Sequence, residues 1–397
     1  MAGRRLFSSF LIGAAGLFLL SGCGASLEEL RTPVPEPLVA VAHVPGYKQV
    51  RFWGDDGNSV TPAYIEAGAA QIMRAAKTDR TINPYDRKFL AISGGGSNGA
   101  FGAGLLVGWT AAGTRPHFDI VTGVSTGSLI APFAFVGSAY DRHLREVYTE
   151  TSGKDIYKTK GILSIIGSES AADNTPLKNM VARYMTDRLI ADIVREHAKG
   201  RRLLIGTTNI DAERPVIWDI GAIASSRDPN RVQLIRDILV ASASIPVVFP
   251  PVRLNVVADG HRYDELHVDG GTSNQSFLFP SNFTATNANI LIGRTPKRTL
   301  YVIRNGKVNP EWSAVKPRIA AIAGKSIASL IKTQGIGDLY RLYSNAQRDK
   351  IDYNAIWVPA SFELKEKEPF DPVYMRALYK LGYEMGKNGI PWEKHPP

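Results

Sequence analysis

The sequence predicts an α/β protein in which helices cover both faces of a parallel or mixed β-sheet. Short apolar runs alternate with longer segments of helical periodicity along most of the chain. The 397 residues, 44% of them hydrophobic and 21% charged, are enough to form a large core. Strands are expected at 88–93, 118–123, 201–210, 215–220, 265–271, 299–306 and 353–361. Helices are expected at 62–77, 99–113, 125–135, 229–244, 316–349 and 372–387.

The first 22 residues have the pattern of a bacterial export signal. Arg4 and Arg5 precede the apolar run LFSSFLIGAAGLFLL, and LSGC follows and ends at Cys23. LSGC resembles a bacterial lipobox, which implies that Cys23 becomes the lipidated first residue of a mature lipoprotein. The next residue is Gly24, which resembles the signal that sorts lipoproteins to the outer membrane. The protein is therefore expected to lie there, facing the periplasm. The alternative is an ordinary signal peptide followed by an incidental cysteine.

The next segment, 23–48, is expected to be a proline-rich extended tether, because proline fixes φ and lacks an amide hydrogen. One folded domain is expected over 49–397. Within it, 150–175 has weak periodicity and is a candidate lid over a site. The net charge is +10, and +8 without the two arginines of the signal. This charge suits an anionic membrane or substrate, whereas no basic run with interleaved aromatic residues suggests nucleic acid.

The segment GVSTG places Ser125 between Gly123 and Gly127, after a predicted strand and before a predicted helix. This context is typical of a nucleophile elbow, in which a serine sits on a tight turn whose neighbours two positions away lack bulk. The N-terminus of the following helix offers amide hydrogens to developing negative charge. Ser125 is therefore the candidate nucleophile. A helix-capping serine in a glycine-rich turn is the alternative.

A second glycine-rich segment, AISGGGSNGAFGAG at 91–104, fits three patterns. Gly94, Gly96 and Gly99 fit the GxGxxG of a dinucleotide site, and Ser97 is the centre of a second GxSxG. A Rossmann site needs an acid at the end of the second strand, where this chain has TGVSTG. Three glycines before Ser97 would support a nucleophile poorly. The segment is therefore interpreted as a loop whose backbone amides receive an anion.

A serine nucleophile needs a proton acceptor within hydrogen-bonding reach. Among the seven histidines, His261 and His267 are the best candidates. His267 shares a predicted strand face with Asp269, which ends that strand before the turn of Gly270 and Gly271. The carboxyl ends of strands gather functional groups in an open α/β sheet, so Asp269 can face the nucleophile. A dry site would raise its proton affinity enough for it to act as the base.

The motifs SGGGSNG, GVSTG and DGG, in this order, resemble those of the patatin-like phospholipases, as does ASASIPVVFPPV at 241–252. The resemblance covers residues 86–275, about half of the chain. It implies a three-layer α/β/α sandwich with a mostly parallel central sheet. It also implies hydrolysis of lipid acyl esters, phospholipid or lysophospholipid, without a metal or cofactor.

The same resemblance implies roles for individual residues. Ser125 would be the nucleophile, and Asp269 would complete a Ser–Asp dyad without histidine. Gly94, Gly95 and Gly96 would lend their amides to the oxyanion hole.

The chain departs from the family pattern at two positions. The family commonly has Asp before the glycines and a basic residue two positions after them, where this chain has Ser93 and Asn98. An amide side chain donates hydrogen bonds without charge, so oxyanion support and headgroup preference stay open at this point. Two other functions also stay open. One is an α/β-hydrolase with a Ser–His–Asp triad that uses His267, and the other is a lipid-anchored envelope protein that binds without catalysis.

Overall fold

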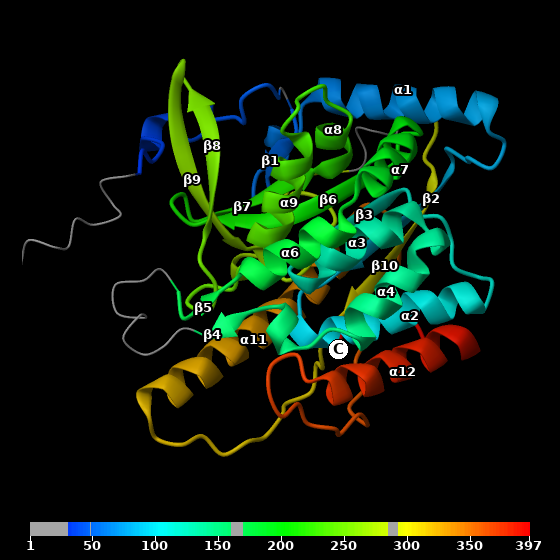
Figure 1. Ribbon diagram of the computed structural model, residues 1–397. Helices are drawn as coiled ribbons and strands as arrows, with labels where there is room; N and C mark the ends of the chain where they lie inside the picture. The colour runs from blue at the N-terminus through cyan, green and yellow to red at the C-terminus, as the bar shows by residue number, and fades with distance from the viewer. Residues whose placement is uncertain (1–30, 48, 160–169, 285–292) are drawn as a thin grey trace, which may run out of the picture.

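A mixed β-sheet forms the centre of the computed structural model, which describes residues 31–47, 49–159, 170–284 and 293–397 (Figure 1). In sheet order its strands are β1 (Arg51–Trp53), β7 (Arg214–Asp219), β6 (Arg202–Asn209), β3 (Ile120–Val124), β2 (Asp86–Ile92), β10 (Lys297–Arg304) and β11 (Asp352–Trp357). The strands from β6 to β11 are parallel, whereas β7 pairs antiparallel with β6. The hairpin of β8 (Val252–Ala258) and β9 (His261–Asp269) joins the sheet where β9 pairs with β6. A separate short pair consists of β4 (Lys158–Thr159) and β5 (Ala172–Asp173).

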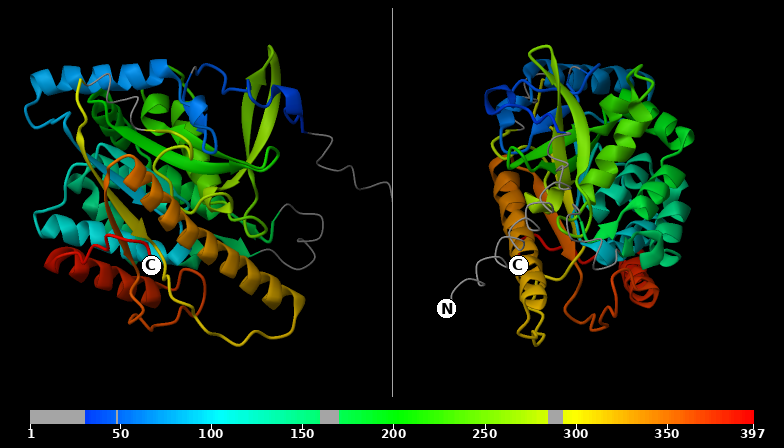
Figure 2. Two further views of the ribbon diagram at one scale, coloured as in Figure 1. Left: turned by 180° about the vertical axis from the view of Figure 1, so that it is seen from behind. Right: turned by 60° about the vertical axis from the view of Figure 1, so that its left-hand side comes forward.

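Helices lie on both faces of this sheet (Figure 2), so the predicted three-layer α/β/α sandwich with a mostly parallel sheet is confirmed. One face carries α1 (Pro62–Thr78) and α11 (Ile319–Arg348). The other face carries α2 (Gly99–Ala111), α3 (Thr126–Val136), α4 (Asp141–Thr149), α6 (Thr175–Tyr184), α7 (Asp187–Ala198), α8 (Ile220–Ala224), α9 (Arg231–Ser242) and α12 (Pro372–Asn388).

Strand β2 shows how one sequence run builds both layers of the core. Successive side chains of a strand point to opposite faces of the sheet. Leu90 and Ile92 are buried in the cluster that includes α2 and α3, whereas Phe89 and Ala91 are buried against α11. A continuous apolar run is therefore needed here, as is usual for a parallel strand covered on both sides.

The strands and helices expected from periodicity are all present, with boundaries shifted by a few residues. Among the elements that the sequence did not predict are α4, α6 and β8. Strand β8 alternates exposed and buried residues in a hairpin that stands at the margin of the sheet, so it lacks the long apolar run of the central strands.

The proline-rich segment differs from the expected free tether. Arg31 forms ion pairs with Asp211 at 2.6 Å and Asp264 at 2.9 Å, and the amide of Thr32 donates to Asp264 at 2.7 Å. Further on, His43 pairs with a residue of β8. The described part of this segment, 31–47, therefore packs on the β8–β9 hairpin and belongs to the folded body.

Helices α2 and α12 pack with their backbones unusually close. A Cβ atom on Gly108 would lie 2.1 Å from the carbonyl oxygen of Tyr383. Gly104 in α2, and Gly382 and Gly386 in α12, approach the opposite helix equally closely. This glycine contact fixes the C-terminal helix against the helix that follows the glycine-rich loop.

None of the helices in the described residues contains an apolar stretch of the length that a transmembrane span requires.

Candidate active site

Ser125 occupies a sharp turn between β3 and α3. Its backbone has φ 53° and ψ −125°, a strained conformation for a residue with a side chain. A Cβ atom on Gly123 would lie 2.4 Å from the carbonyl oxygen of Gly127, and one on Gly127 would lie 2.3 Å from that of Ile92. Both flanking positions therefore require glycine, and the turn has the geometry of a nucleophile elbow.

Asp269 lies at the end of β9, where its buried carboxyl group is close enough to the side chain of Ser125 for Ser125 to lower its pKa. Strand β6 brings these distant segments together. Its Gly206 pairs with Val124 of β3, and its next residue, Thr207, pairs with Asp269. The structure thus joins the two residues that the sequence singled out as nucleophile and base.

The DGG turn supports the Asp269 carboxylate. The amide of Gly271 donates to Oδ1 of Asp269 at 2.7 Å, and a Cβ atom on Gly270 would lie 2.4 Å from the carbonyl oxygen of Gly206. Burial raises the pKa of Asp269 to about 7, while the Ser125 side chain and the Gly271 amide act in the opposite direction. A carboxyl group with this pKa can both accept and release a proton near neutral pH, as a general acid–base group must.

Two serines at the end of α9 hold the nucleophile and the acid. The Ser242 hydroxyl accepts a hydrogen bond from the Ser125 amide at 3.0 Å and donates to the carbonyl of Gly206 at 2.7 Å. The carbonyl of Ser244 accepts from the Asp269 amide at 2.9 Å. The sequence singled out ASASIPVVFPPV, which contains both serines, but assigned neither of them a role.

The glycine-rich loop between β2 and α2 passes directly beside the nucleophile. A Cβ atom on Gly94 would lie 3.2 Å from Cβ of Ser125. The Gly94 amide donates to the carbonyl of Gln275 at 3.1 Å, so it is already engaged within the protein. Of the three glycines expected to supply oxyanion amides, Gly94 therefore serves as a close-packed neighbour instead.

Other amides around Ser125 remain free to bind an anion. Within the described ranges of the chain, the amides of Gly95, Gly96 and Thr126 donate to no acceptor. Gly95 has φ 153°, and a Cβ atom there would lie 2.1 Å from the carbonyl oxygen of Asn305. This position accordingly requires glycine. The close approach to Asn305 holds the loop in the conformation that leaves these amides unpaired.

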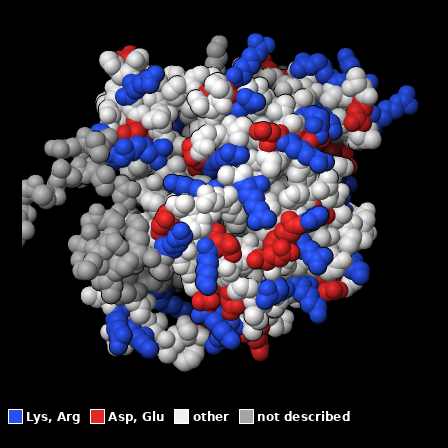
Figure 3. All heavy atoms as spheres, viewed as in Figure 1, with Lys and Arg blue, Asp and Glu red and all other residues white. Residues whose placement is uncertain are grey.

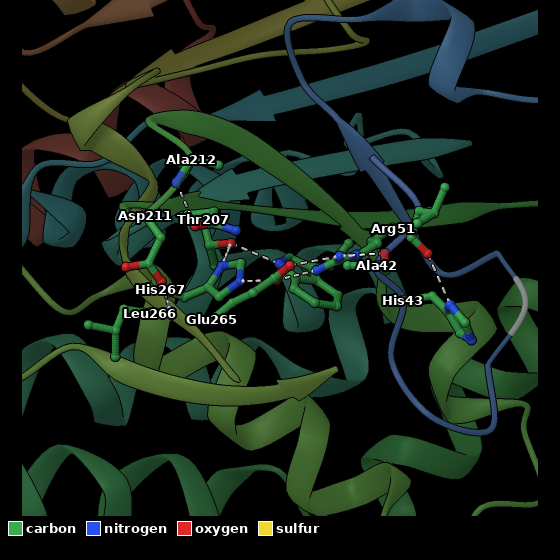
Figure 4. A network of polar contacts seen from close by, with 12 residues as sticks. Ala42, His43, Arg51, Thr207, Asp211, Ala212, Glu265, Leu266 and His267 are labelled. Atoms are coloured by element: carbon green, nitrogen blue, oxygen red, sulfur yellow. Dashed lines mark hydrogen bonds and ion pairs between the residues drawn. The ribbon is translucent and has the colours of Figure 1, made fainter. Parts of the chain in front are cut away.

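His267 lies close to Asp269 in the sequence but faces a different set of groups (Figure 4). It is fully buried, with Nδ1 2.9 Å from the Thr207 hydroxyl and Nε2 3.1 Å from the Glu265 carboxylate. Arg51 pairs with the same carboxylate at 2.5 Å. Burial lowers the pKa of His267, although Glu265 acts to raise it. Both ring nitrogens are thus engaged away from Ser125, as in a structural core histidine.

The turn after Asp269 is fastened to α11. The carboxylate of Asp338 in α11 accepts from the amides of Gln275 at 2.6 Å and Ser276 at 3.1 Å. The Gln275 side chain in turn donates to the carbonyl of Gly271 at 3.0 Å. Gln275 therefore links helix α11 to the DGG turn, and its carbonyl also holds the Gly94 amide. No sequence pattern marked this residue.

The family model of the patatin-like phospholipases matches residues 90–280, which include the glycine-rich loop, Ser125 and Asp269. Residues 90–280 belong to the patatin-like phospholipase family. The expected family is therefore confirmed, and it supports lipid acyl hydrolysis as the general chemistry of this fold. A comparison with curated proteins gives no match.

One solved structure illustrates a more distant likeness. The crystal structure of VipD from Legionella pneumophila shares 12% sequence identity with this chain at a TM-score of 0.40. The alignment covers 77% of this chain and 66% of the VipD chain, so this chain spans a little under two thirds of that length.

The two departures from the patatin pattern have structural partners. The hydroxyl of Ser93 accepts from the Asn305 amide at 2.9 Å, and the Ser93 carbonyl accepts from the Asn305 side chain at 2.9 Å. Asn98 accepts from the hydroxyl of Tyr374 in α12 at 2.6 Å. Ser97, the competing serine, accepts from the Phe370 amide at 3.0 Å. The C-terminal part of the chain thus fixes the loop at both positions where it departs from the family pattern.

Some predicted features lie outside the described residues. Cys23 and the signal sequence are among them, and so is 160–169 of the candidate lid. The described flanks of 150–175 contain the β4–β5 pair, which packs near Phe249 and Phe370. Among the residues whose positions are described, no group of three or more His, Cys, Asp or Glu is placed to hold a metal ion.

Proposed function

We propose that this protein is a serine acyl hydrolase that cleaves phospholipid or lysophospholipid esters through a Ser125–Asp269 dyad. The observation that carries the proposal is the placement of Ser125, on a strained turn, beside the buried carboxyl group of Asp269, whose pKa burial raises to about 7. An ordinary surface aspartate would be too weak a base to take a serine proton, whereas desolvation makes Asp269 a stronger one.

In the first half of the reaction, Asp269 accepts the hydroxyl proton of Ser125 while Oγ attacks the ester carbonyl. The carbonyl oxygen gains the negative charge, which the free amides of Gly95 and Gly96 stabilise together with that of Thr126. In other hydrolases one such donor contributes about 3–4 kcal/mol to transition-state stabilisation. The tetrahedral intermediate then collapses, and Asp269 gives its proton to the leaving alcohol.

The second half releases the acyl group. A water molecule attacks the acyl-enzyme ester while Asp269 takes its proton, and the same amides stabilise the second oxyanion. Collapse returns the proton to Oγ of Ser125 and frees the fatty acid. The cycle closes with the dyad in its starting state.

The proposal is tested with Ser125→Ala and Asp269→Asn, assayed on a short p-nitrophenyl ester and on lipid extracts analysed by mass spectrometry. Both variants are expected to lose at least 10³-fold in turnover, since each removes a member of a unit that acts together. Circular dichroism and thermal melting serve as the folding control. Substantial turnover by a folded Ser125→Ala protein would overturn the proposal, and the lipids consumed only by wild type would define headgroup and acyl preference.

The rival triad is tested through His267. Because Thr207 and Glu265 engage both ring nitrogens, we expect His267→Gln to keep more than a tenth of wild-type turnover in the folded protein. A triad would lose nearly all of it. A non-catalytic binding protein is tested with a fluorophosphonate probe, which should label Ser125 in wild type and fail to label Ser125→Ala.

We further propose that the chain is a lipoprotein of the cell envelope, anchored through Cys23 to the outer membrane and facing the periplasm. The support is the LSGC sequence that ends at Cys23, after a basic and apolar leader. The mass of the mature N-terminal peptide tests this, because Cys23→Ala should abolish the added lipid. An unmodified peptide from wild type would contradict the proposal.

A further inference from the structure

The N-terminal half of α11 is largely uncovered by the other described parts of the structure. Residues 322–331 are exposed around the helix, whereas the following half packs against the sheet. Figure 2 shows this half projecting beyond the body of the protein. An isolated surface helix is normally polar on its free side, so its composition is informative.

This projecting half carries exposed aliphatic side chains on one side. Ile319, Ile322, Ile327, Leu330 and Ile331 are all exposed, at 89% for Ile319 and 70% for Leu330. At 3.6 residues per turn they occupy one half of the helix circumference. A contiguous aliphatic stripe of this size marks a binding surface rather than ordinary solvent-exposed surface.

A tryptophan lies in the loop fastened beside this stripe. The ammonium group of Lys325 donates to the carbonyl of Glu311 and to the Ser313 hydroxyl, and Lys332 pairs with the Glu311 carboxylate at 2.9 Å. These contacts hold the loop against α11, and between them Trp312 is 87% exposed. An exposed tryptophan is typical of surfaces that enter the interface between water and lipid.

The charge around the stripe is strongly positive. Residues 307–332 contain five basic residues and one acid. In Figure 3, Lys and Arg side chains stand among uncharged atoms at the lower left, where Figure 1 places this half of α11. A second copy of this chain would bring the same positive charges together, whereas an anionic lipid surface would attract them.

The same helix continues to the site. Beyond the projecting half, Asp338 binds the amides of Gln275 and Ser276, and Gln334 binds the carbonyl of Ser273. These three residues lie two to five positions after Gly271. A surface bound by the first half of α11 would thus be joined to the dyad by one continuous helix.

We propose that Trp312 and the exposed stripe of α11 dock this protein on an anionic lipid membrane, so that lipid enters the site from the bilayer. The delivery of lipid to the site rests on the proposed function, whereas docking itself does not require catalysis. The aliphatic side chains enter the acyl boundary while the basic residues meet the headgroups, as for other interfacial helices.

Docking is tested in the full chain with Ser125→Ala and Cys23→Ala, so that neither lipid hydrolysis nor a lipid on Cys23 contributes. An environment-sensitive fluorophore is attached at Leu330→Cys and, as a matched control, at Ala67→Cys. Ala67 is an exposed position of α1, at the other end of the molecule (Figure 1). The fluorophore at 330 should be quenched by lipid-borne quenchers in phosphatidylglycerol vesicles, and that at 67 should not. Membrane attachment elsewhere in the chain affects both alike.

Catalysis provides the second arm. The double variant Ile319→Glu, Leu330→Glu should lose at least tenfold in turnover of vesicle lipid, because burying each aliphatic side chain contributes about tenfold to partitioning. Its turnover of a soluble short ester should stay within twofold of wild type, as should both activities of Ala67→Glu. If no variant turns over any ester, the proposed function fails while the fluorescence still tests docking.

Three outcomes would overturn the docking proposal. The first is equal quenching at positions 330 and 67. The second is equal docking on phosphatidylcholine and phosphatidylglycerol vesicles, which would remove the role of charge. The third is a wild-type dimer that the double variant converts to a monomer without any change in quenching, which would assign the stripe to a second copy of the chain.

Discussion

The buried carboxyl of Asp269 leads to a prediction that links stability and catalysis. Its pKa is raised from 3.8 to about 7, so between these values the folded protein holds a proton that the unfolded chain has lost. Stability therefore falls as the pH rises from about 4 to about 7, since the folded state must then ionise a desolvated group. From pH 5 to the folded pKa is about two units, which corresponds to a loss of about 3 kcal/mol.

Asp269→Asn removes this titration while keeping a side chain that can accept from Gly271. The difference in unfolding free energy, variant minus wild type, is expected to grow by about 3 kcal/mol between pH 5 and pH 8. Urea denaturation of both proteins at several pH values measures it, and other titrating groups cancel in the comparison. In wild type, kcat/KM should rise with pH through about 7 as the base ionises. A stability difference independent of pH would refute the raised pKa and, with it, the reason why Asp269 can serve as the base.

Three further substitutions test how the site is held. Gly95→Ala should lower turnover by at least about 100-fold, because a Cβ atom 2.1 Å from the Asn305 carbonyl forces the amides of the loop away from the oxyanion. Ester assays of the folded variant measure this, and normal activity would show that the loop is not the oxyanion site. Ser242→Ala leaves the Ser125 amide without its acceptor and should cost about 1–3 kcal/mol of unfolding free energy, with turnover reduced as the elbow shifts. An unchanged melting curve would count against that contact. Gly108→Ala should cost about 1–3 kcal/mol by forcing α2 and α12 apart, which urea denaturation would detect as a lower midpoint.

The central sheet could be predicted from the sequence because its strands have a strong local signal. Residues 89–92 of strand β2 form an uninterrupted apolar run, buried on both faces, and residues 203–205 of β6 form a similar buried run. The packing of residues 31–47 on the hairpin could not be predicted in this way. The prolines of this segment do predict an extended chain, but the acids that hold Arg31 lie at 211 and 264, and no local pattern shows that pairing.

The candidate site likewise contains residues that local sequence patterns mark and residues that they do not. Ser125 and Asp269 have glycine neighbours that close packing demands, and these glycines are visible as motifs. Ser242, Gln275 and Asn305 carry no such mark, because each acts on a residue more than 100 positions away or through a backbone group. The engaged amide of Gly94 could not be foreseen either, since its acceptor is the carbonyl of Gln275.

The packing of the N-terminal segment sets the length of chain that would connect the folded body to a lipid on Cys23. Arg31 is fastened to the β8–β9 hairpin, so only the eight residues from 23 to 30 separate that point from a lipid on Cys23. Eight residues span at most about 28 Å when fully extended. If Cys23 carries a lipid, a connection this short would keep the folded body close to the bilayer and so at a high local concentration beside it. A modest affinity of the folded body for lipid would then suffice for membrane binding. Lengthening the connecting segment should lower the local concentration at the bilayer without altering the site.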